Sequence, residues 1–535
     1  MAALRATHPA PEADEYRRAG WWRPDTLWTA FAATATRRPE ALALIEDDVR
    51  LGFGELRGRA ESLAAGLHAL GIRAGDVIAL QLPNWWEAVA VYLAAARLGA
   101  AANPVLPIAR ERELRFVLGR SGARLLFIPG ALRDVDHRSL LGVVRADLPA
   151  LEHVITVRAA PGPGMTAWEA LPAHAPPPPA DDADAIALLM YTSGTTADPK
   201  GVLHSHATLL AEARSLAAVH ALGPADRVLM PSPLTHVSGL VHAVLVPAAL
   251  GTSAVLMPRW DPARARDLIR RERVTYMVGA PTFLRDLAEA SPPDPDPDRS
   301  LRLFSCGGAA VDPAMLRWAA ARLGCAAKRV YGSTEFPTVS TSGPDDPPER
   351  CVDGEGRPIA PVRIRLVDEQ DRPVPVGGEG EILARGPECF LGYHDPAMNT
   401  DAFTPDGWFR TGDLGVRDAD GYLRITGRRK DVIIRKGENV SAREVEETIA
   451  THPAVREVAV IGLPDPGAGE IVCAVLRLRP GAAAPDVAAL GRHLLAAGLS
   501  KRKLPERVEV IGDFPRTDSG KVAKRVLRER LVPQG

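Results

Sequence analysis

The chain has few cysteines, and none of them is placed to form a pair. Its five cysteines, at positions 306, 325, 351, 389 and 473 of 535, are scattered. No Cys-x-x-Cys pair occurs, and no histidine pair has the spacing of a structural zinc site. The sequence therefore argues against a disulfide framework and against structural zinc, and it predicts a reducing, cytoplasmic compartment.

An excess of charge and a long apolar run are also missing. The chain carries 65 basic and 66 acidic residues, which gives no reason to expect a nucleic-acid partner. The first 24 residues are polar and lack the apolar core of a secretory signal. The longest membrane candidate, residues 85–102, contains Glu87 and Arg97. We therefore expect no integral membrane segment and interpret this stretch as a buried helix.

Strand and helix signals alternate through the first 350 residues, which predicts an α/β fold with parallel, doubly wound sheets. A small β-rich subdomain is predicted around residues 359–383, where short alternating strands appear. A separate α/β unit begins at residue 427 and ends in a basic tail. The predicted strands are 77–82, 125–128, 154–157, 227–230, 253–256, 275–278, 303–305, 455–463 and 471–478, and the predicted helices are 85–98, 262–273, 281–290 and 486–497.

The most informative stretch is 191–206, Tyr-Thr-Ser-Gly-Thr-Thr-Ala-Asp-Pro-Lys-Gly-Val-Leu-His-Ser-His. Its small residues, hydroxyls and lysine suit an anion. An apolar strand precedes it and a helix at 205–219 follows, so we predict a strand–turn–helix phosphate cradle. It is not a Walker A loop, because Pro199 precedes the lysine and Gly201 follows it. The alternative is a flexible surface loop. The candidate phosphate-binding residues are Thr192, Ser193, Gly194, Thr195, Thr196 and Lys200.

Four more motifs follow in order: Tyr-Gly-Ser-Thr-Glu at 331–335, Gly-Trp-Phe-Arg-Thr-Gly-Asp at 407–413, Gly-Arg-Arg-Lys-Asp at 427–431 and Pro-Arg-Thr-Asp-Ser-Gly-Lys at 515–521. With these motifs, residues 25–530 strongly resemble the adenylate-forming (AMP-binding) superfamily of acyl-CoA synthetases, carrier-protein adenylation domains and luciferases. The branch it most resembles is that of the fatty- or alicyclic-acid CoA ligases. The resemblance implies an N-terminal adenylation domain, 1–426, and a mobile C-terminal lid, 427–535.

Activation of an acid by ATP brings two anions together, so the site must supply positive charge and positioning. Lys200 could neutralise the β- and γ-phosphates, although a solvated lysine is the simpler alternative. Glu335 offers the hard oxygen that Mg²⁺ prefers. Thr334 can donate a hydrogen bond to the α-phosphate.

The adenosine site is predicted around Tyr331, whose flat ring could stack on adenine. Gly332 belongs to the same motif, which could alternatively be only a strand end with a turn. Upstream, Gly307, Gly308 and Ala309 would let a base or an acyl chain lie against the backbone.

The carboxylate of Asp413 matches the paired hydroxyls of ribose, and Arg428 could assist it. The structural alternative is an aspartate that only caps a turn.

The resemblance assigns moving parts to the C-terminal region. It implies that Lys521 enters the active site and bridges the substrate carboxylate and the α-phosphate, although read alone it is one charge in a basic tail. Lys430 occupies the hinge position of the family. Gly437 would leave a tunnel open for the pantetheine thiol.

His236 lies where amino-acid-activating relatives carry an aspartate, so an amino-acid substrate is disfavoured. Its ring could gate the carboxylate entrance, or it could be a packed, hydrogen-bonded histidine. We interpret His204 and His206 as helix-start residues. The other expected pocket residues are small or apolar and fit an alkyl, alicyclic or simple aromatic acid: Val237, Gly239, Thr282, 307–310 and Thr338.

The predicted function is a ligase that uses ATP and Mg²⁺ to make an acyl-adenylate and passes the acyl group to CoA. The alternative is a stand-alone enzyme that loads a separate carrier protein, since we expect no Gly-x-Ser carrier domain after Lys521. A luciferase-like oxygenase is permitted by the fold but required by no feature. An inactive nucleotide-binding protein is disfavoured, because the acidic and basic positions that the chemistry needs are present. A homodimer is among the candidate assemblies.

Overall fold

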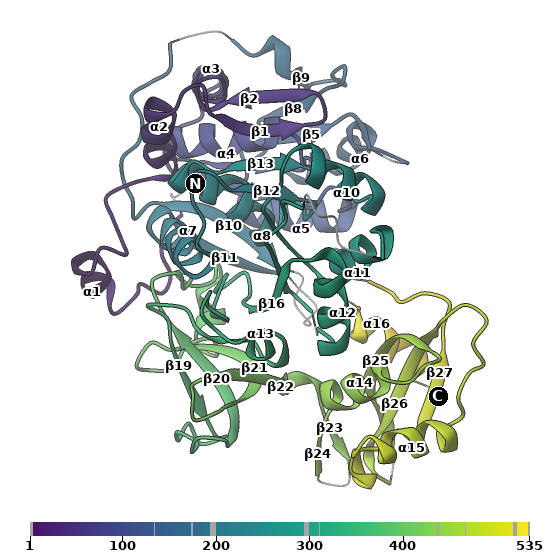
Figure 1. The fold of residues 1–535 in the computed structure, drawn as a ribbon. Helices are drawn as coiled ribbons and strands as arrows, with labels where there is room; N and C mark the ends of the chain where they lie inside the picture. The colour runs from purple at the N-terminus through teal and green to yellow at the C-terminus, as the bar shows by residue number, and fades with distance from the viewer. Residues whose placement is uncertain are drawn as a thin grey trace.

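The computed structural model describes residues 4–132, 134–172, 175–192, 199–293, 299–309, 311–435, 438–465, 467–516 and 522–532. Figure 1 shows a large N-terminal part, a β-rich subdomain below it and a smaller C-terminal unit beside that subdomain. This arrangement confirms the predicted α/β fold class. No helix among the described residues is both long and apolar enough to cross a membrane.

The largest sheet of the described chain has nine strands, and its central strands run parallel. Helices α10 (Pro262–Arg271), α11 (Pro281–Ala290) and α12 (Pro313–Leu323) pack on one face, where Leu268, Leu287 and Leu316 join a buried cluster. The strand order is β18 (Arg357–Pro358), β17 (Ser340–Thr341), β16 (Ala326–Tyr331), β15 (Leu303–Gly307), β14 (Tyr276–Gly279), β12 (Arg227–Met230), β13 (Ser253–Leu256), β1 (Leu42–Glu46) and β2 (Val49–Gly52).

A second sheet of seven described strands lies on the other side of helix α4 (Trp86–Leu98). Every residue of this helix from Glu87 to Leu98 is buried, which confirms that the stretch is a core helix. The strand order is β11 (Lys200–Ser205), β10 (Ile186–Thr192), β4 (Ala101–Pro104), β3 (Val77–Leu80), β5 (Leu125–Pro129), β8 (His153–Val157) and β9 (Thr166–Ala167). Nearby helices include α2 (Leu27–Arg37), α3 (Phe53–Ala69), α5 (Glu111–Ser121), α6 (His137–Val144), α7 (His206–His220), α8 (Val237–Leu240) and α9 (Val246–Leu250).

The predicted strand–turn–helix cradle is wrong in one respect: a second strand stands between the loop and the helix. Strand β11 pairs antiparallel with β10, with Thr192 opposite Lys200, and only then does α7 begin. The physical reason is tertiary pairing. Leu203 exchanges backbone hydrogen bonds with the distant segment 391–392, so residues 200–205 extend between two partners.

The β-rich subdomain is an antiparallel sheet of β19 (Arg363–Val367), β20 (Glu379–Arg385), β21 (Phe409–Arg417) and β22 (Leu423–Arg428). The expected boundary at residue 426/427 falls inside β22, and a 3-10 turn at Arg429–Asp431 follows that strand. Figure 1 shows β22 leading from the subdomain toward the C-terminal unit.

The C-terminal unit is built on a sheet of five described strands. Its basic tail contains a helix, α16 (Lys524–Leu531), which the sequence pattern did not predict. The other elements are β23 (Val432–Arg435), β24 (Glu438–Ser441), α14 (Ala442–Ala450), β25 (Val455–Asp465), β26 (Gly469–Leu478), α15 (Val487–Ala496) and β27 (Arg507–Val510).

Candidate active site

Residues 307–309 and the motif 331–335 lie at the carboxyl ends of two neighbouring parallel strands, β15 and β16. Open α/β sheets bind their ligands at this end of the strands. Gly307 ends β15 and lies opposite Val330 of β16, which ends at Tyr331. A Cβ at position 307 would stand 2.5 Å from the Val330 carbonyl oxygen, so only glycine fits there. Gly308 has a φ of +81° and open space around it, and Ala309 is exposed. The structure therefore brings residues 307–309 beside the Tyr331 motif.

The Tyr331 motif turns sharply after its strand. A Cβ on Gly332 would lie 1.9 Å from the Pro337 carbonyl oxygen, which excludes any side chain at this position. The amide of Ser333 donates to the Phe336 carbonyl at 2.8 Å. This turn presents Thr334 and Glu335, both half-buried, at the end of the sheet.

Asp413 is held by Tyr331 and Arg428. The Tyr331 hydroxyl donates to Asp413 Oδ2 at 2.7 Å, and Arg428 Nε donates to Oδ1 at 2.7 Å. Arg428 stands directly opposite Asp413 in the β21–β22 pairing. Burial, with the Asp413 charge, raises the pKa of Tyr331, so its phenol stays protonated and donates. The Asp413 side chain is 8 % exposed and fixed in orientation.

Tyr331 is buried and takes part in this contact through its hydroxyl. The ring is only 8 % exposed and packs in a cluster with Phe336 and Ile382. Its hydroxyl positions the candidate ribose ligand, and stacking on adenine stays a prediction.

Glu335 and Lys200 both contact the side chain of Tyr393. The Tyr393 hydroxyl donates to Glu335 Oε1 at 2.8 Å, and Lys200 Nζ lies 4.6 Å from the centre of the Tyr393 ring. Burial lowers the pKa of Lys200, the nearby Glu335 charge opposes this, and the charge of Lys430 lowers it further. The structure thus brings Lys200 and Glu335 together at Tyr393. Tyr393 was missed because no motif marks it and it lies 58 residues from Glu335 in the sequence.

His204 binds the backbone of the Tyr331 motif at Thr334. Its Nε2 lies 2.8 Å from the Thr334 carbonyl oxygen and its Nδ1 lies 3.1 Å from Thr208 Oγ1. Because a carbonyl only accepts, Nε2 carries the proton. Burial lowers the pKa of His204 to about 4, so the ring is neutral. The expectation that His204 starts a helix is wrong, since it lies in β11; His206 is the first residue of α7.

His236 caps a short helix. Its Nδ1 accepts from the Ser238 amide at 3.3 Å and lies 3.0 Å from Ser238 Oγ. These contacts match the packed, hydrogen-bonded alternative, and the gating role stays a prediction.

Thr338, expected to line the acid pocket, binds a buried acid. Its hydroxyl donates to Glu212 Oε1 at 2.6 Å. Burial, and next the charge of Glu388, raises the pKa of Glu212 to about 8, so this carboxyl is largely protonated at neutral pH. Sequence patterns gave no signal for it, because a glutamate inside a helix is usually solvated.

Several predicted residues lie outside the described part of the chain: Ser193, Gly194, Thr195, Thr196, Gly437 and Lys521. Thr192 ends β10, with its hydroxyl 3.5 Å from the Lys200 carbonyl oxygen.

The donor set around Glu335 suits magnesium. Among the described residues, no group of three or more His, Cys, Asp or Glu side chains could hold a metal ion. A single carboxylate fits Mg²⁺, which takes most of its ligands from substrate phosphates and water. Glu335 Oε1 is bound by Tyr393, which leaves Oε2 for such an ion.

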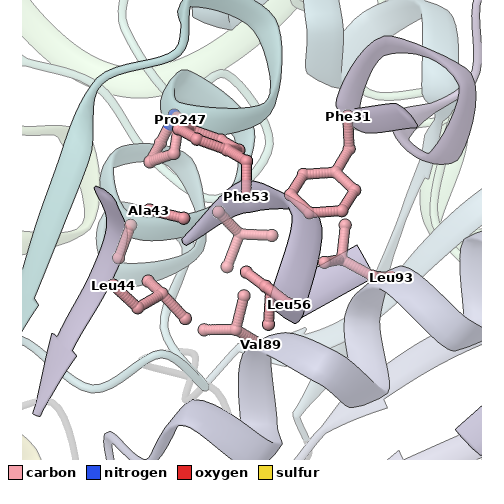
Figure 2. Close-up of a pocket in the computed structure, with 10 residues that line it drawn as sticks. Phe31, Ala43, Leu44, Phe53, Leu56, Val89, Leu93 and Pro247 are labelled. Carbon is pink, nitrogen blue, oxygen red and sulfur yellow. The ribbon is translucent and has the colours of Figure 1, made fainter. Parts of the chain in front are cut away.

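Two hollows differ in chemistry. Figure 2 shows one lined by apolar side chains such as Phe31, Phe53 and Leu93, which is a packing gap in the core rather than a site for anions. The other, of about 740 Å³, is lined by Asp401, Arg410 and Arg429, among others. Asn399 also lines this hollow and accepts from the Tyr393 amide at 2.8 Å, so the polar hollow adjoins the segment that carries Tyr393.

Comparison with known proteins places the chain in a family. The AMP-binding enzyme family matches residues 31–394, and the AMP-binding enzyme C-terminal domain matches residues 444–521. The medium-chain fatty-acid–CoA ligase of Escherichia coli (strain K12) is 34 % identical over 531 residues, covering 97 % of this chain and 92 % of the relative. The salicyl-AMP ligase / salicyl-S-ArCP synthetase of Mycobacterium tuberculosis (strain ATCC 25618 / H37Rv) is 35 % identical over 536 residues, covering 98 % and 94 %. The crystal structure of ATP-bound MatB from Rhodopseudomonas palustris superposes with a TM-score of 0.84 at 31 % identity, covering 95 % of this chain and 99 % of that one.

The chain therefore belongs to the AMP-binding enzyme family. It is an adenylate-forming ligase, which activates an acid with ATP.

Glu335→Gln should raise the Mg²⁺ concentration needed for half-maximal adenylate formation by about tenfold or more, because the amide keeps the shape but loses the charge. Pyrophosphate release measured across a Mg²⁺ series checks this. Glu369→Gln, which neutralises an exposed carboxylate, is the control. An unchanged Mg²⁺ dependence in Glu335→Gln would make Glu335 a structural residue.

Proposed function

We propose that this enzyme joins a carboxylic acid to CoA through an acyl-adenylate, releasing AMP and pyrophosphate. The observation that carries the proposal is the convergence of two fixed units at the carboxyl end of strand β16. One is Asp413 with Tyr331 and Arg428, and the other is Glu335 with Lys200 and Tyr393. The first unit suits a ribose, and the second suits a magnesium-bound phosphate chain.

In the first half-reaction the carboxylate oxygen attacks the α-phosphorus of ATP, and the bond to pyrophosphate breaks. Asp413 would accept hydrogen bonds from the ribose hydroxyls and so fix the nucleoside. Lys200 would neutralise the departing pyrophosphate, and Thr334 would donate to the α-phosphate. Mg²⁺ bound at Glu335 would supply further positive charge against the phosphates. Lys521 would bridge the two reacting groups.

In the second half-reaction the CoA thiol attacks the acyl carbonyl, loses its proton, and displaces AMP. The proposal requires the C-terminal unit to turn about Lys430 so that residues 436–437, which join β23 to β24, face the adenylate. Support for CoA as the acceptor comes from relatives such as the medium-chain fatty-acid–CoA ligase, which covers nearly the whole chain. The candidate acids are alkyl, alicyclic or simple aromatic.

Loading of a separate carrier protein is the second candidate function. The salicyl-S-ArCP synthetase among the relatives favours it, since that protein matches this chain with similar identity and coverage. The two functions share the first half-reaction and differ only in the thiol.

The deciding test uses Gly437→Leu, with CoA, ATP, Mg²⁺ and a panel of acids. A side chain there should block the thiol, so adenylate should still form while thioester formation is lost. Gly512→Leu, a substitution in open space in the same unit, should behave as the unmodified enzyme. If the unmodified enzyme forms adenylate but acylates only a phosphopantetheinylated carrier and never CoA, the carrier-loading function replaces the proposal.

A further inference from the structure

The N-terminal segment, residues 4–22, is bound along the stretch 385–403. The amides of Thr7 and His8 both donate to the Leu391 carbonyl at 3.0 Å. The His8 ring stacks on Phe403 with 3.7 Å between the ring centres. Further along, Glu12 pairs with Arg385 at 2.5 Å, and Trp22 Nε1 donates to the Pro387 carbonyl at 2.9 Å. Contacts at several separate points hold this segment in place.

One of these contacts closes around the backbone of Tyr393. The Thr7 hydroxyl donates to the Tyr393 carbonyl at 2.6 Å, and the Tyr393 amide donates to Asn399 Oδ1 at 2.8 Å. Asn399 Nδ2 donates in turn to Thr7 Oγ1 at 3.0 Å. Thr7 and Asn399 thus bind both polar backbone groups of Tyr393 and also each other. A Cβ on Gly392 would stand 2.3 Å from Thr7 Oγ1, so the packing is tight.

The side chain of Tyr393 points the other way, into the candidate metal and phosphate site. Its hydroxyl binds Glu335 Oε1 and its ring lies beneath the Lys200 ammonium. The neighbouring Phe390 amide donates to the Glu335 carbonyl at 2.8 Å. Position and orientation of Glu335 are therefore both set by the segment that Thr7 holds.

We infer that the N-terminal segment is a positioning element for adenylation: Thr7 fixes Tyr393, and Tyr393 fixes Glu335 and Lys200. This inference rests on the proposed roles of Glu335 and Lys200. The chain of contacts links residues 386 positions apart in the sequence. A hydrogen bond from Tyr393 restrains a half-buried carboxylate that would otherwise rotate, and catalysis depends on such restraint.

The test compares Thr7→Val, which removes the hydroxyl at similar size, with Thr7→Ser, which keeps it. Adenylate formation is measured without CoA, by pyrophosphate release across a Mg²⁺ series. We expect Thr7→Val to raise the half-maximal Mg²⁺ concentration by about threefold to tenfold. Conversion of supplied acyl-adenylate to thioester should stay unchanged, and Thr7→Ser should behave as the unmodified enzyme.

A second pair keeps the inference testable if Thr7→Val does not fold. Tyr393→Phe removes the hydroxyl that binds Glu335 and should shift the Mg²⁺ dependence in the same direction. Tyr422→Phe removes a similar hydroxyl, bound to Asp346 at 2.7 Å, and should not. Melting temperatures are recorded for every variant.

The outcomes separate this inference from the proposed function. A lower melting temperature with an unshifted Mg²⁺ curve in Thr7→Val or Tyr393→Phe would overturn the positioning role and leave the ligase intact. If the unmodified enzyme forms no adenylate with any acid, the proposed function itself fails. Adenylate without CoA acylation would change the acceptor but leave the positioning role standing, because the readout precedes thiol attack.

Discussion

Replacing Arg158 with methionine should destabilise the N-terminal part by about 3 kcal/mol, because two buried carboxylates lose the guanidinium that binds both. Arg158 donates to both oxygens of Glu46 at 2.7 and 2.9 Å, and to both oxygens of Glu87 at 2.8 and 2.7 Å. The glutamate side chains are 3 % and 7 % exposed. We use the lower end of the range for breaking a buried pair, since Arg158 itself is 35 % exposed.

The position of Arg158 explains why the loss is expected to be large. It follows β8 of the seven-stranded sheet, whereas Glu46 ends β1 of the nine-stranded sheet and Glu87 lies in α4 between them. The guanidinium also lies 4.5 Å from the centre of the Trp85 ring. One side chain thus ties both sheets to the helix that separates them.

The loss of stability in Arg158→Met should depend on pH. Burial raises the pKa of Glu87 even with Arg158 present, and removing Arg158 should raise it further. A carboxyl whose pKa is higher in the folded protein than in the unfolded chain favours folding at low pH. The difference in stability between Arg158→Met and the unmodified protein should therefore be full above the pKa that Glu87 has in the variant. It should shrink as the pH falls from there to the lower pKa that Glu87 has in the unmodified protein.

Urea unfolding followed by tryptophan fluorescence measures the effect, with Trp85 and Trp86 as nearby reporters. Arg59→Met is the matched control, because Arg59 lies 4.4 Å from the Trp86 ring but pairs with the exposed Glu55. It should cost less than about 1 kcal/mol. Equal losses in the two variants would mean that the stacking, and not the buried ion pairs, stabilises the fold.

Much of the fold was predictable from the sequence because local patterns dictate it. Strands Arg227–Met230 and Ser253–Leu256 and helix Pro281–Ala290 occur with the predicted bounds. The strand–turn–helix prediction failed at residues 200–205 for a different reason. Those residues extend because the distant segment 391–394 pairs with them, through Leu203 with Leu391 and Gly392 and through Gly201 with His394.

The sequence predicted only those residues of the candidate site that belong to recognisable motifs. Asp413 and Arg428 are brought together because they lie on adjacent strands of one hairpin, which the short spacing implied. Tyr393 and Thr7 belong to no motif, and His204 belongs to the 191–206 stretch but was interpreted as a helix start. Their roles arise from contacts with Glu335, Thr334 and Tyr393, made across long separations that periodicity and composition do not encode.

The described structure also fixes one orientation of the C-terminal unit. Glu355 of the N-terminal part accepts from Arg443 of α14 at 2.9 Å and from Arg329 at 3.3 Å. Its other oxygen accepts from the Ile425 amide of β22 at 2.8 Å. Because Arg329 remains beside Glu355, moving α14 away would leave that carboxylate paired. The ion pair between Glu355 and Arg443 can therefore hold the C-terminal unit in this orientation, and breaking it would not prevent the rotation that the proposed function requires.

The same orientation places the basic tail beside the predicted hinge. The Lys524 ammonium lies 2.7 Å from Glu446 and 4.0 Å from Asp431, the residue after Lys430. Lys430 in turn lies close enough to Lys200 to lower its pKa. The described chain on the C-terminal side of Lys521 is thus anchored beside the predicted hinge segment.

Lys521→Ala should slow adenylate formation by about 10²–10³-fold, the effect of removing one preorganised group that stabilises developing phosphoryl charge. Conversion of supplied acyl-adenylate to thioester should be nearly unchanged, because no phosphoryl bond breaks in that step. Single-turnover measurements of the two half-reactions, run separately, check this. Lys501→Ala removes the same charge from an exposed position in the same unit and should alter neither. Equal losses in both half-reactions would contradict an adenylation-specific lysine and with it the requirement that the C-terminal unit turn between the two steps.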